Sequence, residues 1–512
     1  MEKRDALRYR IAPLEMTPSE FRKVGYQLVE RIAEFLCTLP DRPVTPDESP
    51  AVIREALGSG SLPEQGTETR YLLEEAANLL FEHSTFNGHP RFMAVITSSA
   101  APIGALGDLL AAAANPNVGA WPGAPIGTEI EAQTIRWIAE MIGYPTDCGG
   151  LLVSGGNMGN FVGFLAARKA KATWDVCTSG LRGQESRQLR VYTSSETHTW
   201  IHKATDMFGV GTEAIRWIPV DEQLCMDTAA LRNQIRADIE AGDVPFLVIG
   251  TAGTVSTGAV DPLPEIAAIC REYDLWFHVD GAYGGFAAVL LNDGKGTVPG
   301  DLKGISEADS VAVDPHKWLY APLEAGCALV RNPEALHDAF SYHPPYYHFA
   351  DQADPTIDYY EYGPQNSRGF RALKVWLALR QVGRTGYVEM ISDDIQLAQE
   401  LYRLVDAQPE LQAFTQGLSI TTFRYVPHDL APGAESVEAY LNRLNTEVLN
   451  RLQKSGEALV SNAVVGGTFL LRACVVNFRT SLEDIEALLG IVTRIGREVD
   501  AAMRPIELKS EA

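Results

Sequence analysis

Short apolar runs alternate with longer stretches of helical period between about residues 100 and 330. The runs that suit buried strands are residues 150–153, 189–193, 245–250, 275–279, 310–313 and 327–330, and helical stretches such as 228–240 and 264–272 lie between them. This alternation is typical of a mostly parallel sheet with helices on both faces. The sequence therefore predicts an α/β fold.

The two ends of the chain have other patterns. Thr17, Pro18 and Glu20 predict a capped helix start, and the apolar positions that follow at helical spacing form a stripe that needs a partner surface. A second helix is expected at 68–83. After residue 372, a helix at 372–381, strands near 418–426 and 469–478, a helix at 436–455 and a last helix opened by Ser481 and Asp484 predict a small α+β unit.

The composition limits which partners and which cellular compartment we expect for the chain. The 512 residues include 66 acidic and 43 basic side chains, and the resulting net charge of -23 repels phosphate backbones, so we expect no nucleic-acid partner. The seven cysteines are scattered without a Cys-x-x-Cys pair, which favours a reducing compartment over a disulfide framework or a metal knuckle. The N-terminus lacks the apolar core of a signal peptide, and apolar runs stay short of the roughly 20 residues of a membrane span. We expect a soluble, cytoplasmic protein without a membrane partner or a metal.

Residues 310–320 read Ser-Val-Ala-Val-Asp-Pro-His-Lys-Trp-Leu-Tyr. Pro315 cannot donate to a sheet, so the expected strand ends before it and places Lys317 just past the carboxyl end, where open α/β sheets bind ligands. A lysine that loses hydration there has a lowered pKa, and its neutral amine attacks carbonyl groups. Taken alone, a lysine at this position is more often a surface residue on a turn, and the other motifs of the sequence overturn that reading.

Residues 154–160 read Ser-Gly-Gly-Asn-Met-Gly-Asn and join the strand at 150–153 to a helix. Gly155 and Gly156 let the backbone approach a ligand, and the helix start at Asn157 offers unpaired N–H groups, so the segment suits one phosphate. It matches neither a Walker lysine loop nor a dinucleotide fingerprint. An ordinary strand-to-helix turn is the alternative reading.

Residues 278–285 read His-Val-Asp-Gly-Ala-Tyr-Gly-Gly at the end of another apolar strand. A carboxylate such as Asp280 is costly there unless a cation meets it, and Ala282 leaves room for a flat ring beside it. An aspartate that faces a protonated ring nitrogen meets both conditions. A helix cap or an isolated salt bridge is the alternative.

Two further strand ends complete the set. His198 follows the strand at 189–193 and can stack on a planar cofactor or transfer a proton, and Thr254 supplies a hydroxyl after the strand at 245–250. A phosphate cradle, a stacking ring, a hydroxyl, an acid for a ring nitrogen and a reactive lysine are together what pyridoxal 5'-phosphate requires.

The segments His-Val-Asp-Gly-Ala-Tyr-Gly-Gly and Asp-Pro-His-Lys-Trp closely resemble the two most telling motifs of the group II pyridoxal-phosphate decarboxylases, and the 37-residue spacing from Asp280 to Lys317 fits. The likeness covers nearly the whole chain. It implies fold-type I, the aspartate-aminotransferase-like architecture, with an N-terminal helical dimerisation segment (1–99), a large cofactor-binding domain (100–371) and a small C-terminal domain (372–512). It also implies a homodimer with shared active sites.

The resemblance assigns roles to residues. Lys317 would form the internal aldimine with the cofactor, and Asp280 would face the pyridine nitrogen. Ala282 and His198 would sandwich the ring, while Gly155, Gly156, Asn157, Asp314 and His316 would lie near the phosphate, and Thr254 would contribute its hydroxyl. Two positions depart from the animal aromatic decarboxylases: Asn157 replaces a serine, and Val255 replaces a threonine.

Residues 341–370 are rich in tyrosine, proline, histidine and aspartate, without strand or helix period, and resemble the mobile loop of the family. The alignment places Tyr346 on the tyrosine that returns a proton after carbon dioxide leaves, where phenylalanine is associated with aldehyde formation. His89, Ile96 and Thr97 fall on the segment that lines the substrate pocket. We expect an aromatic L-amino acid as substrate. A decarboxylase of acidic amino acids, an aldehyde synthase and a catalytically silent scaffold are the alternatives.

Overall fold

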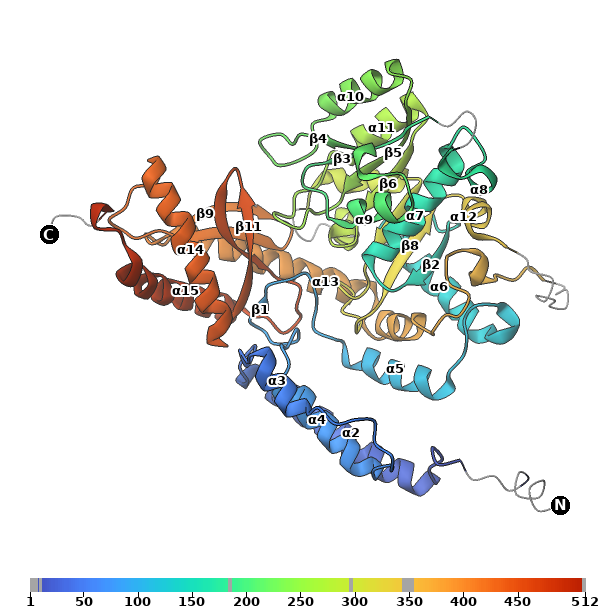
Figure 1. Ribbon diagram of the computed structural model, residues 1–512, viewed down its shortest axis with the longest axis horizontal. Helices are drawn as coiled ribbons and strands as arrows, with labels where there is room; N and C mark the ends of the chain where they lie inside the picture. Colours follow the sequence, from blue (N-terminus) through green and yellow to red (C-terminus); the bar gives the residue numbers. More distant parts are fainter. Residues whose placement is uncertain (1–7, 9–11, 183–186, 294–297, 343–353, 509–512) are drawn as a thin grey trace.

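The computed structural model describes residues 8, 12–182, 187–293, 298–342 and 354–508. Its centre is a seven-stranded sheet, with helices packed around it (Figure 1). In order across the sheet, the strands are β2 (Gly149–Val153), β8 (Gly326–Val330), β7 (Ser310–Val313), β6 (Trp276–Asp280), β5 (Val244–Thr251), β3 (Leu189–Ser194) and β4 (Ile215–Ile218). Only β8 runs antiparallel to its neighbours. The α/β expectation is confirmed, and the carboxyl ends of β3, β5, β6 and β7 share one edge.

The helices of this part are α5 (Pro102–Ala114), α6 (Pro125–Met141), α7 (Gly156–Lys171), α8 (Val176–Ser179), α9 (Trp200–Met207), α10 (Thr228–Glu240), α11 (Leu263–Tyr273) and α12 (Pro333–Phe340). Short 3-10 helices connect elements along the chain: η2 (Leu39–Asp41), η3 (Trp121–Gly123), η4 (Gly180–Arg182), η5 (Thr212–Ala214), η6 (Gly284–Asn292), η7 (Gly300–Glu307), η8 (Tyr359–Glu361) and η9 (Ile506–Leu508).

Helices cover both faces of the large sheet. Gly163 of α7 lies against the side chain of His278, whereas Gly250 lies against Leu263 and Ile266 of α11. His278 pairs with Ile249, the residue before Gly250, so the two contacts lie on opposite faces because side chains alternate along a strand. Asp280 follows His278 by two residues and therefore points to the α7 face.

A second, five-stranded sheet occupies the C-terminal part. Its strands are β1 (Phe92–Met93), β11 (Leu459–Val465), β12 (Thr468–Cys474), β10 (Ile420–Tyr425) and β9 (Leu411–Gly417), in this order, and only the pairing of β1 with β11 is parallel. Helices α14 (Glu435–Ser455) and α15 (Leu482–Met503) pack on it. The predicted capping pair of Ser481 and Asp484 is confirmed.

Helix α13 (Ala372–Asp406) connects the two sheets. It contacts α5 and α6 on one side and β9 and β10 on the other (Figure 1). The sequence predicted only its first turns, because Gly383 has non-helical angles (φ 69°, ψ 167°) that divide it into two helical stretches. The proposed division of the chain at residues 99 and 371 stays a prediction.

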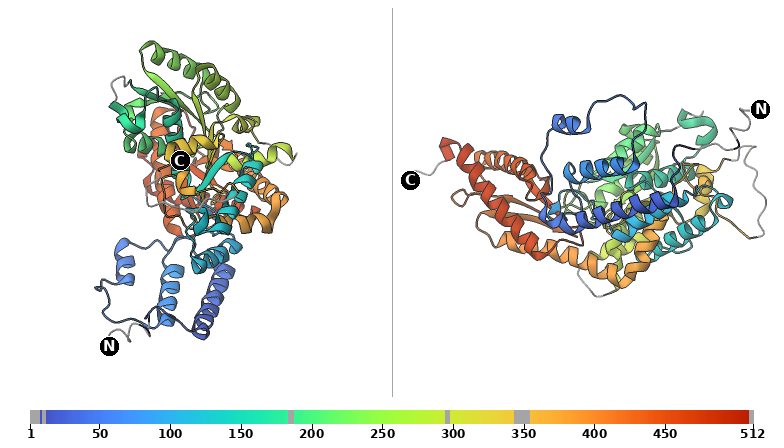
Figure 2. Two further views of the ribbon diagram at one scale, coloured as in Figure 1. Left: turned by 90° about the vertical axis from the view of Figure 1, so that its right-hand side faces the viewer. Right: turned by 90° about the horizontal axis from the view of Figure 1, so that it is seen from below.

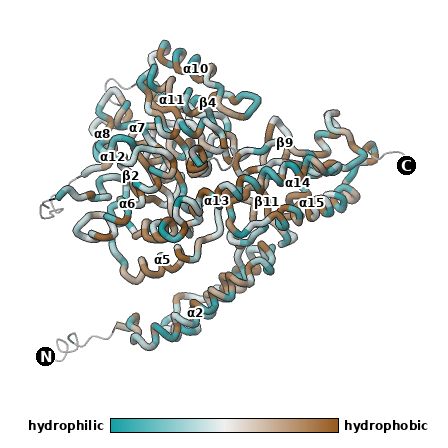
Figure 3. Tube along the Cα trace, turned by 180° about the vertical axis from the view of Figure 1, so that it is seen from behind, coloured by the Kyte–Doolittle hydropathy of each residue, from teal (hydrophilic) through white to brown (hydrophobic). Residues whose placement is uncertain are grey.

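The N-terminal helices form an arm that projects from the two sheets (Figure 2). They are α2 (Pro18–Thr38), α3 (Pro50–Leu57) and α4 (Thr69–Glu82), and α2 starts with the predicted capping box. Phe35 stacks on Phe81 of α4 with ring centroids 4.3 Å apart, yet α2 has no buried residue. Hydrophobic positions also recur along the neighbouring α5 (Figure 3). Among the described residues, every helix is too short or too polar to cross a membrane.

Candidate active site

Lys317 lies in the loop between β7 and β8, at the carboxyl end of β7 as predicted. The backbone turns tightly, with the Lys317 N–H donating to the Asp314 carbonyl at 2.9 Å. The Lys317 Nζ lies 3.0 Å from Asp314 Oδ2, and both side chains are largely buried. Asp314 Oδ1 is buried without a hydrogen-bond partner in the described part of the chain. The amine is therefore held by a carboxylate that still has a free acceptor.

His316 lies on the other side of this carboxylate. Its Nε2 is 3.7 Å from Asp314 Oδ2, and its Nδ1 donates to the Ala325 carbonyl at 2.7 Å. Burial lowers the pKa of His316. The ring is therefore neutral at pH 7, with its second nitrogen turned toward Asp314.

The predicted phosphate cradle lies beside the same carboxylate. Gly155 precedes α7 with φ +131°, an angle that L side chains rarely adopt. A Cβ on Gly156 would lie 2.8 Å from Asp314 Oδ2 and 2.9 Å from the Ala282 Cβ. These contacts bring together three residues from separate segments. Asn157 is the second residue of α7, whose first N–H groups have no intrahelical partner.

Asp280 ends β6 and is only 6% exposed. Its Oδ2 accepts a hydrogen bond from Trp200 Nε1 at 2.7 Å, and its Oδ1 accepts one from the Ala282 N–H at 3.2 Å. Both donors are neutral, and among the described residues no cation lies within salt-bridge distance of this carboxylate. A buried anion of this kind favours a cationic ligand.

His198 is hydrogen-bonded to Trp200, the residue that also donates to Asp280. Its Nδ1 accepts the Trp200 backbone N–H at 3.3 Å, so a neutral ring carries its proton on Nε2. Although solvent reaches the ring, nearby protein atoms displace enough water to lower the pKa of His198, and the charges of Asp280, Lys317 and Asp314 also act on it. The charges of the predicted acid, lysine and phosphate-side carboxylate are thus close enough to His198 to act on its pKa.

This arrangement fits pyridoxal phosphate. The uncompensated Asp280 carboxylate matches a protonated ring nitrogen, and the start of α7 matches a phosphate. The Lys317 amine, held by Asp314, matches the aldehyde.

The remaining predicted residues lie at different depths. Ser98 donates from Oγ to the His316 carbonyl at 2.9 Å, so the segment that contains Ile96 and Thr97 runs along the lysine loop. Ile96 is buried, and Thr97 Oγ1 is buried without a partner in the described chain. Their assignment to the substrate pocket stays a prediction.

The contacts of His89 and Thr254 do not reach the lysine. His89 is fully buried, its Nδ1 accepts the Arg91 N–H at 3.0 Å, and its carbonyl accepts from Asn477. Burial and the charge of Arg91 lower the pKa of His89. Thr254 Oγ1 accepts the Ala259 N–H at 3.1 Å within its own turn. Tyr346 lies outside the described residues.

Two residues that the sequence did not single out contact this region. Trp200 holds both His198 and Asp280. Asp394 of α13 accepts hydrogen bonds from Trp318 Nε1 and the Tyr320 hydroxyl, which both follow Lys317 within three residues. A buried tryptophan two residues after His198 was the available signal for the first, whereas nothing in the sequence pairs Asp394 with the lysine loop.

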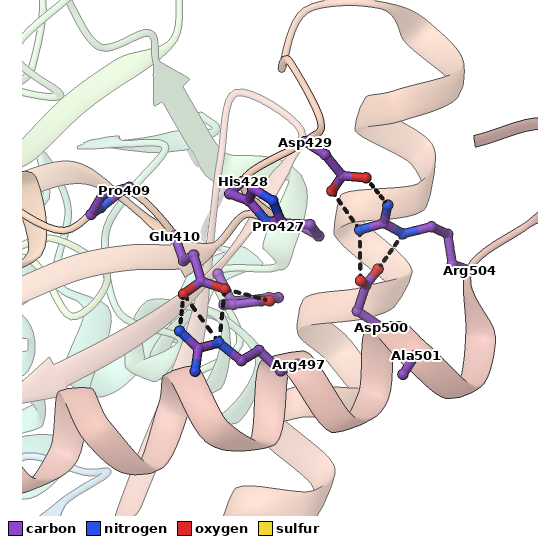
Figure 4. Close-up of a pocket in the computed structure, with 10 residues that line it drawn as sticks. Pro409, Glu410, Pro427, His428, Asp429, Arg497, Asp500, Ala501 and Arg504 are labelled. Atoms are coloured by element: carbon purple, nitrogen blue, oxygen red, sulfur yellow. Dashed lines mark hydrogen bonds and ion pairs between the residues drawn. The ribbon is translucent and has the colours of Figure 1, made fainter. Parts of the chain in front are cut away.

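A separate hollow on the surface is lined by residues of the C-terminal part, all within 409–504 (Figure 4). Its arginines are already paired, Arg497 with Glu410 and Arg504 with Asp429 and Asp500. It offers no reactive amine, so the chemistry belongs to the site around Lys317.

Comparisons with known proteins agree with this geometry. Residues 52–426 match the pyridoxal-dependent decarboxylase conserved domain. The aromatic-L-amino-acid decarboxylase of Bacillus atrophaeus is 33% identical over 95% of this chain and 97% of its own length. The 4-hydroxyphenylacetaldehyde synthase of Rhodiola rosea is 28% identical over 95% of this chain and 96% of its own length.

Among solved structures, Oryza sativa TDC with PLP and tryptamine is similar, with a TM-score of 0.86 and 27% identity over 95% of this chain and 99% of that one. The expected fold-type I architecture and the pyridoxal-phosphate cofactor are confirmed. The chain belongs to the pyridoxal-dependent decarboxylase family and is a pyridoxal-phosphate-dependent amino acid decarboxylase.

Proposed function

We propose that this enzyme decarboxylates an aromatic L-amino acid of the tyrosine, tryptophan or dihydroxyphenylalanine type to the amine and carbon dioxide. The observation that carries the proposal is the 33% identity, over nearly both full lengths, to a decarboxylase of aromatic amino acids. The buried, apolar Ile96 on the segment beside the lysine loop supports an apolar substrate side chain.

Each group in the site has a proposed task. Lys317 would hold the cofactor through its aldehyde carbon, and the start of α7 with Gly155, Gly156 and Asn157 would bind the phosphate. Ala282 and His198 would flank the ring. When bound, pyridoxal phosphate draws electrons from the α-carbon of the amino acid, which lets the carboxylate leave as carbon dioxide.

Three side chains of the protein would hold or transfer protons and keep the lysine amine in place. Asp280, a buried carboxylate that accepts hydrogen bonds from two neutral donors, would keep the proton on the ring nitrogen. Asp314 would hold the Lys317 amine, as it does at 3.0 Å in the structure, while the substrate occupies the site. Tyr346 would return a proton to the α-carbon after the carboxylate has left.

Product analysis by mass tests this proposal. The holoenzyme is incubated separately with tyrosine, tryptophan, dihydroxyphenylalanine, glutamate and aspartate. An amine from one of the aromatic substrates is the expected result. An amine from glutamate or aspartate alone would contradict the aromatic assignment.

A second candidate is aldehyde synthesis on the same scaffold, because the Rhodiola rosea relative is a 4-hydroxyphenylacetaldehyde synthase. Aldehyde with ammonia in place of amine would establish it. Tyr346 argues for decarboxylation, and Tyr346→Phe is expected to raise the share of aldehyde. An unchanged product ratio would remove Tyr346 from its proposed role.

We also propose a homodimer in which the N-terminal arm covers a second copy. In the single chain Phe21 is 57% and Tyr26 is 73% exposed, and exposed apolar faces of this kind mark an interface. Phe21→Glu is expected to yield monomer in light scattering, whereas the control Lys23→Glu stays dimeric. A wild-type monomer would contradict the dimer.

We also propose a cellular location for the enzyme. All seven cysteines are free thiols. This supports a reducing compartment, and we place the enzyme in the cytoplasm.

A further inference from the structure

Trp200 contacts two of the proposed site groups at once. It is the first residue of α9 and has no exposed surface. Its backbone N–H donates to His198 Nδ1 at 3.3 Å, and its indole Nε1 donates to Asp280 Oδ2 at 2.7 Å. The two bonds use different donors, so a change of the indole leaves the bond to His198 in place.

A buried framework holds the indole ring. His278 meets it edge-on, with ring centroids 5.8 Å apart and planes at 76°. His278 is fixed in turn by Ser310 Oγ at 2.8 Å and Asn160 Oδ1 at 2.7 Å, and burial lowers the pKa of His278 to about 4. His278 is therefore neutral at pH 7 and adds no competing charge beside Asp280. The indole has little freedom to turn away from the carboxylate.

We propose that Trp200 is a positioning residue that keeps Asp280 ionised and oriented for the ring nitrogen of the cofactor. This inference rests on the proposed role of Asp280. A hydrogen bond donated to a carboxylate stabilises its charged form and lowers its affinity for a proton. Without the indole donor, Asp280 would bind the shared proton more strongly, and the ring nitrogen would lose part of its positive charge.

The test compares Trp200→Phe with the control Trp376→Phe. Trp376 also donates one indole hydrogen bond, to Gln133 Oε1 at 2.7 Å, but lies on α13 outside the site. Each apoenzyme is loaded with pyridoxal phosphate labelled with ¹⁵N in the ring. The readouts are the ¹⁵N chemical shift, the cofactor dissociation constant, and kcat and KM.

In Trp200→Phe the ¹⁵N shift is expected to move toward that of neutral pyridine, and the cofactor is expected to bind about tenfold more weakly, which corresponds to about 1.4 kcal/mol. kcat is expected to fall by a similar factor with KM nearly unchanged. Trp376→Phe is expected to match wild type in all readouts.

Two additional variants separate the outcomes. Asp280→Asn should itself move the ¹⁵N shift, and if it does while Trp200→Phe does not, Trp200 only fills space and the inference is wrong. If Asp280→Asn changes neither the shift nor the affinity, the assignment of Asp280 fails, and the proposed site fails with it. Benzothienylalanine at position 200 keeps the ring shape without the N–H donor. If Trp200→Phe does not fold, this replacement decides the question by the same readouts.

Discussion

Replacing Asp394 by asparagine should make the enzyme's stability less sensitive to pH. Asp394 is 2% exposed on α13, and its Oδ2 accepts hydrogen bonds from Trp318 Nε1 at 3.0 Å and from the Tyr320 hydroxyl at 2.8 Å. Burial outweighs these bonds and raises the pKa of Asp394 from 3.8 to about 7. The folded chain therefore keeps a proton here that the unfolded chain releases.

The sign and size follow from proton linkage. Because the folded state binds the proton more tightly, the contribution of Asp394 to stability is fully present below pH 3.8 and is lost as the pH rises to about 7. The difference between the two pKa values corresponds to about 4 kcal/mol. Of this, about 2 kcal/mol is lost between about pH 5.5 and about pH 8.5.

Urea unfolding of wild type and Asp394→Asn at these two pH values measures the effect. The compared quantity is the free energy of the first unfolding transition, the product of its midpoint and slope, since the chain contains more than one core. Buried Asp261 has its pKa raised by burial to about 6 and titrates in both proteins, so it cancels in the difference. Wild type should lose about 2 kcal/mol more than the variant on going to the higher pH. Equal losses in both proteins would refute the reasoning.

Two other substitutions test the packing around the site. Arg368 pairs with Glu131 in the core, at 1% and 0% exposure, and also donates to the Val118 and Leu152 carbonyls. Arg368→Met should lower the free energy of unfolding in urea by about 3–5 kcal/mol because it leaves Glu131 charged and buried. The double variant that also carries Glu131→Leu should recover part of this loss. A larger loss of stability in the double variant would contradict this account of the pair. Gly156→Ala should weaken cofactor binding about tenfold or more, since the new Cβ would lie 2.8 Å from Asp314 Oδ2. The control Gly490→Ala on α15, where a Cβ meets nothing within 4 Å, should gain about 0.5–1 kcal/mol, and unchanged cofactor affinity in Gly156→Ala would contradict the close fit.

The strands that carry the site could be predicted because buried strands are rich in apolar residues. Strands β6 and β7 are buried at every residue, and most of their residues are apolar. Two strands with mixed exposure, β4 and β11, were missed. β4 has Trp217 at 41% exposure, and β11 alternates irregularly between buried and exposed residues, so neither gives a clear period.

Pairings between distant residues were beyond the sequence. β1 has only two residues, and its partner β11 lies more than 350 residues further along the chain. Trp200 and Asp280 are 80 positions apart, and Asp394 lies 74 positions from Tyr320. Each residue type is ordinary by itself, and only the fold makes the contact. The motifs at strand ends were predictable for the opposite reason, because parallel strands bring their carboxyl ends to one edge.

The central claim is that the Lys317 amine carries the cofactor within reach of Asp280. Borohydride reduction of the holoenzyme makes the link between lysine and cofactor permanent, and peptide mass spectrometry then locates it. The modification should lie on the peptide that contains Lys317. A modification on another lysine, such as Lys203, whose charge also reaches His198, would contradict the claim.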